Sequence, residues 1–163
     1  MNTLIKKLQL KKVKRSDFAS QETHCMEAEL YYNNLLVAIV SNSGHGGPDH
    51  HEVLNQVGWD QLMAECKEIA DDLGHKYAGM ELDSAVGELM NEWLLAADMK
   101  KLMVYKVLYL GKDDNLYQTN NAKNAAMRNA WAKQLESDDK VAIVLNNIPK
   151  ARALEIFRNA NRY

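Results

Sequence analysis

This chain of 163 residues has few of the features that mark secreted or membrane proteins. It has only two cysteines, Cys25 and Cys66, which lie far apart and have no metal-type spacing. We therefore expect reduced thiols rather than a disulfide framework. No apolar run approaches the roughly 20 residues needed to span a bilayer, and the N-terminus lacks the apolar core of a signal peptide. These absences predict a cytoplasmic protein that does not cross a membrane.

Linkers, internal repeats and low-complexity tracts are also absent from the sequence. The composition, with 47% hydrophobic and 26% charged residues, is ordinary for a globular protein. A chain of this length can bury a core without disulfides or metals. We therefore predict a single domain over residues 1–163.

Charge is distributed unevenly, although the net charge is only −2. Residues 1–15 carry six cations and no acid, whereas the segment from Glu52 to Asp98 is strongly acidic. The cations Lys123, Arg128 and Lys133 near Trp131 could contact phosphates, but no nucleic-acid motif accompanies them. The acidic middle also argues against a broad basic groove, so we do not expect a nucleic-acid partner.

A β-hairpin is the most clearly marked element of the N-terminal third. From Glu22 to Tyr32 apolar residues alternate with polar ones, and Asn33-Asn34 tolerates the positive φ of a tight turn. The apolar run 35–41 is the returning strand, and residues 3–14 form a lysine-rich edge strand.

Helical periodicity follows this hairpin. It predicts helices over 60–73, with Asp60 as N-cap and Gly74 as terminator, and over 83–101. Further along we expect strands at 104–110, 116–119 and 140–145, a helix capped by Asn120 or Asn121 and ending near Glu136, and a last helix starting at Pro149. The predicted fold class is α+β, an antiparallel sheet with an N-terminal hairpin and about four helices packed on it.

The segment from Ser41 to His51 is the strongest candidate for a site. It holds three of the eight glycines, three of the five histidines and one of the two prolines. Because it leaves an apolar strand, its backbone can turn sharply and present main-chain N–H groups to a ligand. Hairpin geometry would also bring the segment around Glu22 and His24 close to it.

These considerations predict a binding loop for a phosphate or a carboxylate, with no catalytic residue, no metal and no cofactor. The histidines would strengthen binding on protonation below about pH 6.5. The predicted ligand-binding residues are Ser41, Asn42, Ser43, Gly44, His45, Gly46, Gly47, His50, Glu22 and His24.

Two catalytic alternatives use the same segment. His45, Asp49, His50, His51 and Glu52 could hold a metal that activates water in a phosphodiester hydrolase or nuclease. Adjacent histidines point apart in an extended segment, however, so both rarely bind one ion. Cys25 or Ser43 could act as a nucleophile with His45, but no orienting acid is identifiable.

The segment Ser-Gln-Glu-Thr at 20–23, the hairpin after it and Ser-Asn-Ser-Gly-His-Gly-Gly at 41–47 resemble a largely uncharacterised group of small proteins from phages and other mobile elements. In that group the pattern is approximately Ser-x-Glu-Thr, a hairpin and Ser/Lys-Asn-Asp-Gly-x-Gly-Gly. The resemblance covers about residues 5–50 and, weakly, residues 144–146. Ser43 replaces the usual Asp, which removes a carboxylate from the loop.

The resemblance implies a phage protein that counters a host defence system. Its partner would be a host defence protein or a small nucleotide-like ligand in the host cytosol. An inhibitor of this kind, without catalytic activity, is therefore the function expected from the sequence. The exposed strand edges are also compatible with a homo-oligomer.

Overall fold

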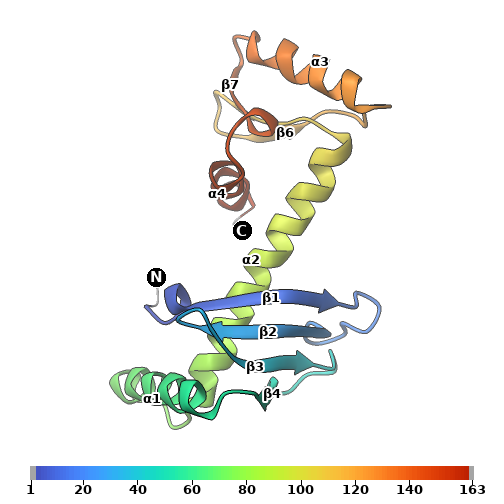
Figure 1. The fold of residues 1–163 in the computed structure, drawn as a ribbon. Helices are drawn as coiled ribbons and strands as arrows, with labels where there is room; N and C mark the ends of the chain where they lie inside the picture. Colours follow the sequence, from blue (N-terminus) through green and yellow to red (C-terminus); the bar gives the residue numbers. More distant parts are fainter. Residues whose placement is uncertain (1–2, 162–163) are drawn as a thin grey trace. The chain divides into compact units, whose positions relative to one another are not determined.

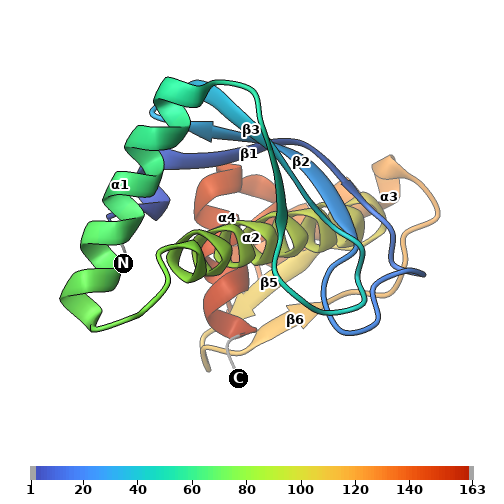
Figure 2. The same ribbon diagram turned by 90° about the horizontal axis from the view of Figure 1, so that it is seen from below.

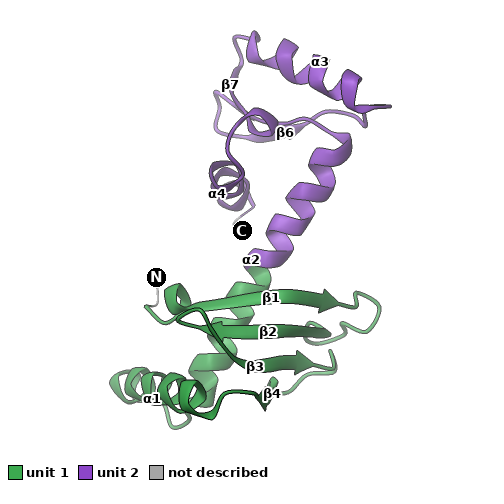
Figure 3. Cartoon of the chain, viewed as in Figure 1, with its two compact units in different colours: residues 1–91 green, residues 92–163 purple. Residues whose placement is uncertain are grey.

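The structure is a computed structural model that describes residues 3–161. The chain divides into two compact units, with the boundary between Asn91 and Glu92 (Figures 1 and 3). A single long helix, α2 (Gly79–Tyr105), belongs to both units. The single-domain expectation stays a prediction. Within residues 3–161, no helix has both the length and the apolar character needed to cross a membrane.

Unit 1 is built on an antiparallel sheet with strand order β1-β2-β3-β4. Its elements before α2 are η1 (Ile5–Lys7), β1 (Leu8–Arg15), β2 (Met26–Tyr32), β3 (Leu35–Asn42), β4 (His50–Val53) and α1 (Gln56–Leu73). The first part of α2 lies across one face of this sheet (Figures 1 and 2).

The predicted hairpin is confirmed as β2 and β3. Asn33 and Asn34 have φ values of 48° and 66°, the left-handed conformation that asparagine tolerates and that the tight turn needs. The alternation in β2 has the expected result, because every second side chain is buried in the unit 1 core. Those buried residues are Met26, Ala28, Leu30 and Tyr32.

Strand β4 is the main element that the sequence did not predict. The predicted loop segment extended to His51, and no strand was expected at residues 50–53, but these residues pair antiparallel with β3, with His51 opposite Val40 and His50 opposite Ser41. This strand has only four residues and no apolar alternation, so its pairing depends on the neighbouring strand rather than on local sequence.

The helix starts also differ from expectation. Asn55, not Asp60, caps α1, because its side chain accepts a hydrogen bond from the Gly58 N–H at 2.8 Å. Gly74 ends α1 as predicted, with a φ of 72°. Helix α2 is several residues longer at both ends than the predicted 83–101.

Unit 2 has a second antiparallel sheet, with strand order β6-β5-β7. After α2 its elements are β5 (Leu108–Gly111), β6 (Leu116–Gln118), α3 (Ala125–Glu136), β7 (Val141–Val144), η2 (Leu145–Asn147) and α4 (Lys150–Ala160). The later strands therefore form their own sheet instead of extending the first. The α+β class, the antiparallel pairing and the four α-helices are confirmed for residues 3–161.

In unit 2 the residues at the helix starts differ from those predicted. Asn124, and not Asn120 or Asn121, caps α3 by accepting from the Met127 N–H at 2.9 Å. Pro149 precedes α4 as its N-cap instead of occupying the first helical position. The main apolar core contains Met99, Leu108, Leu145, Ala153, Ile156 and Phe157.

Candidate functional site

Two connections meet at one end of the unit 1 sheet. Antiparallel pairing places the β1–β2 connection, residues 16–25, beside the β3–β4 connection, residues 43–49. The carbonyl of Gly44 joins them, because it accepts hydrogen bonds from the N–H groups of Gln21 and Glu22, both at 2.9 Å, and of Thr23 at 3.4 Å. The glycine-rich loop is therefore attached to the segment carrying Glu22, as the sequence predicts.

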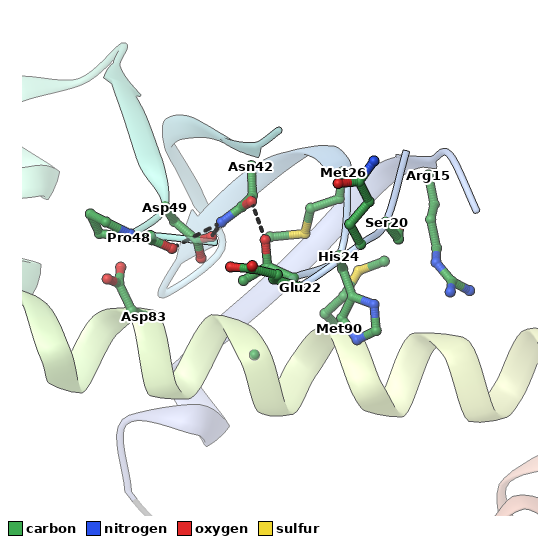
Figure 4. A pocket seen from close by; sticks show the side chains of 14 residues that line it. Arg15, Ser20, Glu22, His24, Met26, Asn42, Pro48, Asp49, Asp83 and Met90 are labelled. Atoms are coloured by element: carbon green, nitrogen blue, oxygen red, sulfur yellow. Dashed lines mark hydrogen bonds between the residues drawn. The ribbon is translucent and has the colours of Figure 1, made fainter. Parts of the chain in front are cut away.

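Asn42 holds this region together from the end of β3. Its Oδ1 accepts from the Thr23 hydroxyl at 2.6 Å and from the Gly44 N–H at 2.9 Å. Its Nδ2 donates to Asp49 Oδ1 at 2.9 Å and to the Gly47 carbonyl at 3.4 Å. One partly buried amide thus connects both ends of the loop and the neighbouring connection (Figure 4).

The loop does not present its amides as the phosphate hypothesis requires. The Gly44 N–H donates to Asn42, and the Gly46 N–H donates to the Thr23 hydroxyl at 3.3 Å. The Gly46 N–H and the backbone of buried Gly44 are therefore used to hold the loop in shape. The expected mechanism, in which loop N–H groups bind a phosphate, needs correction at these two residues.

The predicted site residues at the strand ends and the predicted histidines do not lie together in one site. Ser41 pairs within the sheet, Ser43 is exposed, and His50 is exposed on β4. A ring nitrogen of His45 lies 3.3 Å from the Gln21 side-chain oxygen. His24 instead faces α2, where its Nε2 lies 3.3 Å from Asn91 Oδ1.

A pocket of about 480 Å³ opens beside the loop, within unit 1. Its walls come from the two connections and from α2, which contributes Asp83, Gly87 and Met90. Of the predicted residues, it is lined by Glu22, His24, Asn42 and Gly47, whereas Ser41, Ser43, Gly44, His45, Gly46 and His50 are not among its lining residues. Figure 4 shows the side chains of Glu22, His24 and Asn42 around the space above α2, together with those of Pro48, Asp49 and Asp83.

The charges around this pocket are mainly negative. Glu22, Asp49 and Asp83 contribute carboxylates, and among residues 3–161 Arg15 is the one lysine or arginine that lines the pocket. Arg15 Nη1 lies 3.0 Å from Asp17 Oδ1, so that cation already has an anionic partner. The pocket consequently favours a positively charged group over a phosphate.

Burial near this pocket shifts the pKa values of Asp83 and His51. Burial raises the pKa of Asp83, nearby Asp49 raises it further, and a hydrogen bond with the Asp49 backbone opposes the increase. Burial also lowers the pKa of His51, whose ring packs on Trp59 with centroids 5.2 Å apart. His51 Nε2 lies 3.8 Å from Asp83 Oδ1, too far for a hydrogen bond, and the ring is neutral at pH 7, so this pair is not a salt bridge there.

The lowered pKa of His51 predicts a pH effect on stability. The unfolded chain takes up a proton at the imidazole near pH 6.5, whereas the folded chain does so only at lower pH. The free energy of unfolding should therefore decrease as pH falls below 6.5, until the folded-state pKa is reached. Urea denaturation between about pH 7.5 and about pH 5.5 should show this decrease, and His51→Gln should reduce it. His50→Gln, at an exposed position, is the control; an equal reduction in both variants would contradict this explanation.

Asp83, Met90 and Arg15 were not identified from the sequence. Asp83 is the first residue of the helix predicted over 83–101, and nothing local indicates that α2 passes beneath the loop. The spacing of Asp83, Gly87 and Met90 at i, i+4 and i+7 does place them on one face of a helix. That pattern could have suggested a shared surface, but not which loop faces it.

The catalytic alternatives find no support in this geometry. In β4 the side chains alternate, so His50 and Glu52 are exposed while His51 packs inward. Among the described residues, no group of three or more histidine, cysteine, aspartate or glutamate side chains is arranged to hold a metal. Cys25 is a free cysteine beside Gly44, and the His45 ring pairs with Gln21.

No protein-family model, curated protein or solved structure matches this chain. The resemblance to the phage group stays a prediction, and the case for a function depends on the pocket itself.

Proposed function

We propose that this chain is a non-catalytic binding protein, and that its unit 1 pocket holds the arginine or lysine side chain of a partner protein. The observation that supports this most directly is the set of three carboxylates, Glu22, Asp49 and Asp83, around a pocket of about 480 Å³. A guanidinium or ammonium group entering it would gain charge-assisted hydrogen bonds. Burial is the main cause of the raised pKa of Asp83, and the cation would relieve the repulsion from Asp49 that adds to it.

Two partners are expected from the sequence, a nucleotide-like ligand and a host protein, and the negative charge of the pocket favours one of them over the other. A nucleotide-like signal carries phosphates, which three carboxylates would repel, and the amides of Gly44 and Gly46 are engaged within the protein. A host protein presenting a basic side chain is the better fit. The proposal therefore retains the hypothesis of a phage protein acting on a host defence protein and sets aside the nucleotide.

Binding of N-acetyl-arginine methylamide, followed by NMR or calorimetry, tests this proposal. The arginine compound should bind, whereas the neutral citrulline analogue and AMP should bind at least about tenfold more weakly. Asp49→Asn combined with Asp83→Asn should weaken arginine binding by about tenfold or more, because two carboxylates are neutralised.

The control is Glu52→Gln, which removes one exposed carboxylate on β4 outside the pocket. It should change arginine binding by less than about twofold, because surface charges beyond contact distance are screened. Equal binding of citrulline, stronger binding of AMP, or an equal loss in Glu52→Gln would refute the proposal. As a second readout, wild-type protein but not the double variant should restore phage plating on a host that carries the targeted defence.

A further inference from the structure

Unit 2 has a groove that the proposed function does not use. It has a volume of about 510 Å³ and is formed by the second half of α2, the start of α3, η2 and the start of α4. These elements belong to unit 2, which Figure 3 shows in purple. The groove is thus complete within one unit.

The interior of the groove is apolar. Residues 96, 99, 100, 103 and 104 of α2 line it with the i, i+3, i+4, i+7, i+8 spacing of one helix face. Met99, Met103, Val104 and Leu154 supply most of its large apolar side chains. Val104 is 49% exposed, and Met103 and Leu154 are partly buried, so these three side chains supply the apolar surface that a ligand can reach. Met99 is only 5% exposed and belongs to the apolar core of unit 2. Methionine side chains adapt readily to ligands of different shape.

The charged residues of the groove all have the same sign. Lys100, Arg128 and Lys150 line it, and its lining includes no aspartate or glutamate. Within residues 3–161, none of these three cations is paired with a carboxylate. Arg128 is held in place because its Nη1 donates to the carbonyls of Val104 at 2.6 Å and Met103 at 3.2 Å, so its position is fixed without a carboxylate partner.

We propose that this groove binds a medium-chain aliphatic carboxylate. The tail would cover Met103, Val104 and Leu154, and the carboxylate would lie among the three cations. The volume is in the range of small-molecule sites, about 300–1,000 Å³.

Titration of the full chain with decanoate, below its micelle-forming concentration, tests this inference. Decanoate should bind with one-to-one stoichiometry, and decyltrimethylammonium, which has the same tail and the opposite charge, at least about tenfold more weakly. Lys100→Glu combined with Lys150→Glu should weaken decanoate binding by about tenfold or more; both residues are exposed, so the fold should be kept. Ala151→Trp, also at an exposed position, should abolish binding by filling the groove.

Lys101→Glu is the matched control, because Lys101 is an exposed neighbour on α2 outside the groove. It should leave decanoate binding within about twofold of wild type. The inference is overturned if decanoate does not bind, if both detergent-like probes bind equally, if Lys101→Glu has the effect of the double variant, or if Ala151→Trp still binds decanoate. None of these outcomes depends on the unit 1 pocket.

Discussion

Gly44→Ala is expected to lower the free energy of unfolding by about 3–5 kcal/mol. Gly44 is buried with a φ of 87°, a conformation that residues with a Cβ rarely adopt. A Cβ there would lie 2.1 Å from the Ala19 carbonyl oxygen and 2.9 Å from the Cys25 Cβ, so backbone would have to move. The movement would also disrupt the three hydrogen bonds to the Gly44 carbonyl. Chemical denaturation followed by circular dichroism measures the change.

Gly47→Ala separates the cost of the left-handed backbone conformation from the cost of the steric clash. Gly47 has a similar φ of 89°, but a Cβ there would meet nothing within 4 Å. This variant should therefore show only the cost of the left-handed conformation, about 1–2 kcal/mol. If Gly44→Ala and Gly47→Ala have equal effects, the close packing against Ala19 is not what requires glycine at position 44.

Asn42→Ala is the second change with a large expected effect, about 2–4 kcal/mol of unfolding free energy. Four hydrogen bonds would be lost, and the Asp49 carboxylate and the Gly44 N–H would both lose a partner. Because Asp49 lines the unit 1 pocket, binding of the arginine compound should weaken as well. Denaturation and calorimetry on the same preparation measure both effects.

Ser43→Ala is the control for Asn42, since Ser43 is the exposed neighbour in the loop and should change stability by less than about 0.5 kcal/mol. Asn42→Asp is a sharper variant. It keeps the oxygen that accepts from Thr23 and Gly44 but places a carboxylate where Nδ2 lies 2.9 Å from Asp49. The Asn42→Asp variant should be least stable at neutral pH, and its stability should increase in acid as the carboxylates protonate. A loss in Asn42→Ala no larger than that in Ser43→Ala would show that Asn42 does not organise the loop.

In the glycine-rich loop, local sequence predicted the backbone bends but not the groups that the backbone amides contact. The glycines predicted the bends, and Gly44, Gly46 and Gly47 do adopt positive φ. The same sequence suggested that the loop amides face a ligand, whereas those of Gly44 and Gly46 bond to side chains of Asn42 and Thr23. A glycine permits a conformation, but the neighbouring segment determines which groups that conformation meets.

The sequence by itself determined the elements whose cause is local. Alternation in β2, the tight turn at Asn33-Asn34 and the termination of α1 at Gly74 depend on residues within a few positions of one another. Tertiary structure alone decided the pairing of β4, the separation into two sheets and the position of Asp83 in one pocket with Glu22 and Asp49. These depend on contacts between residues far apart in the chain, and the free energy of such contacts comes from packing and charge that no short segment contains.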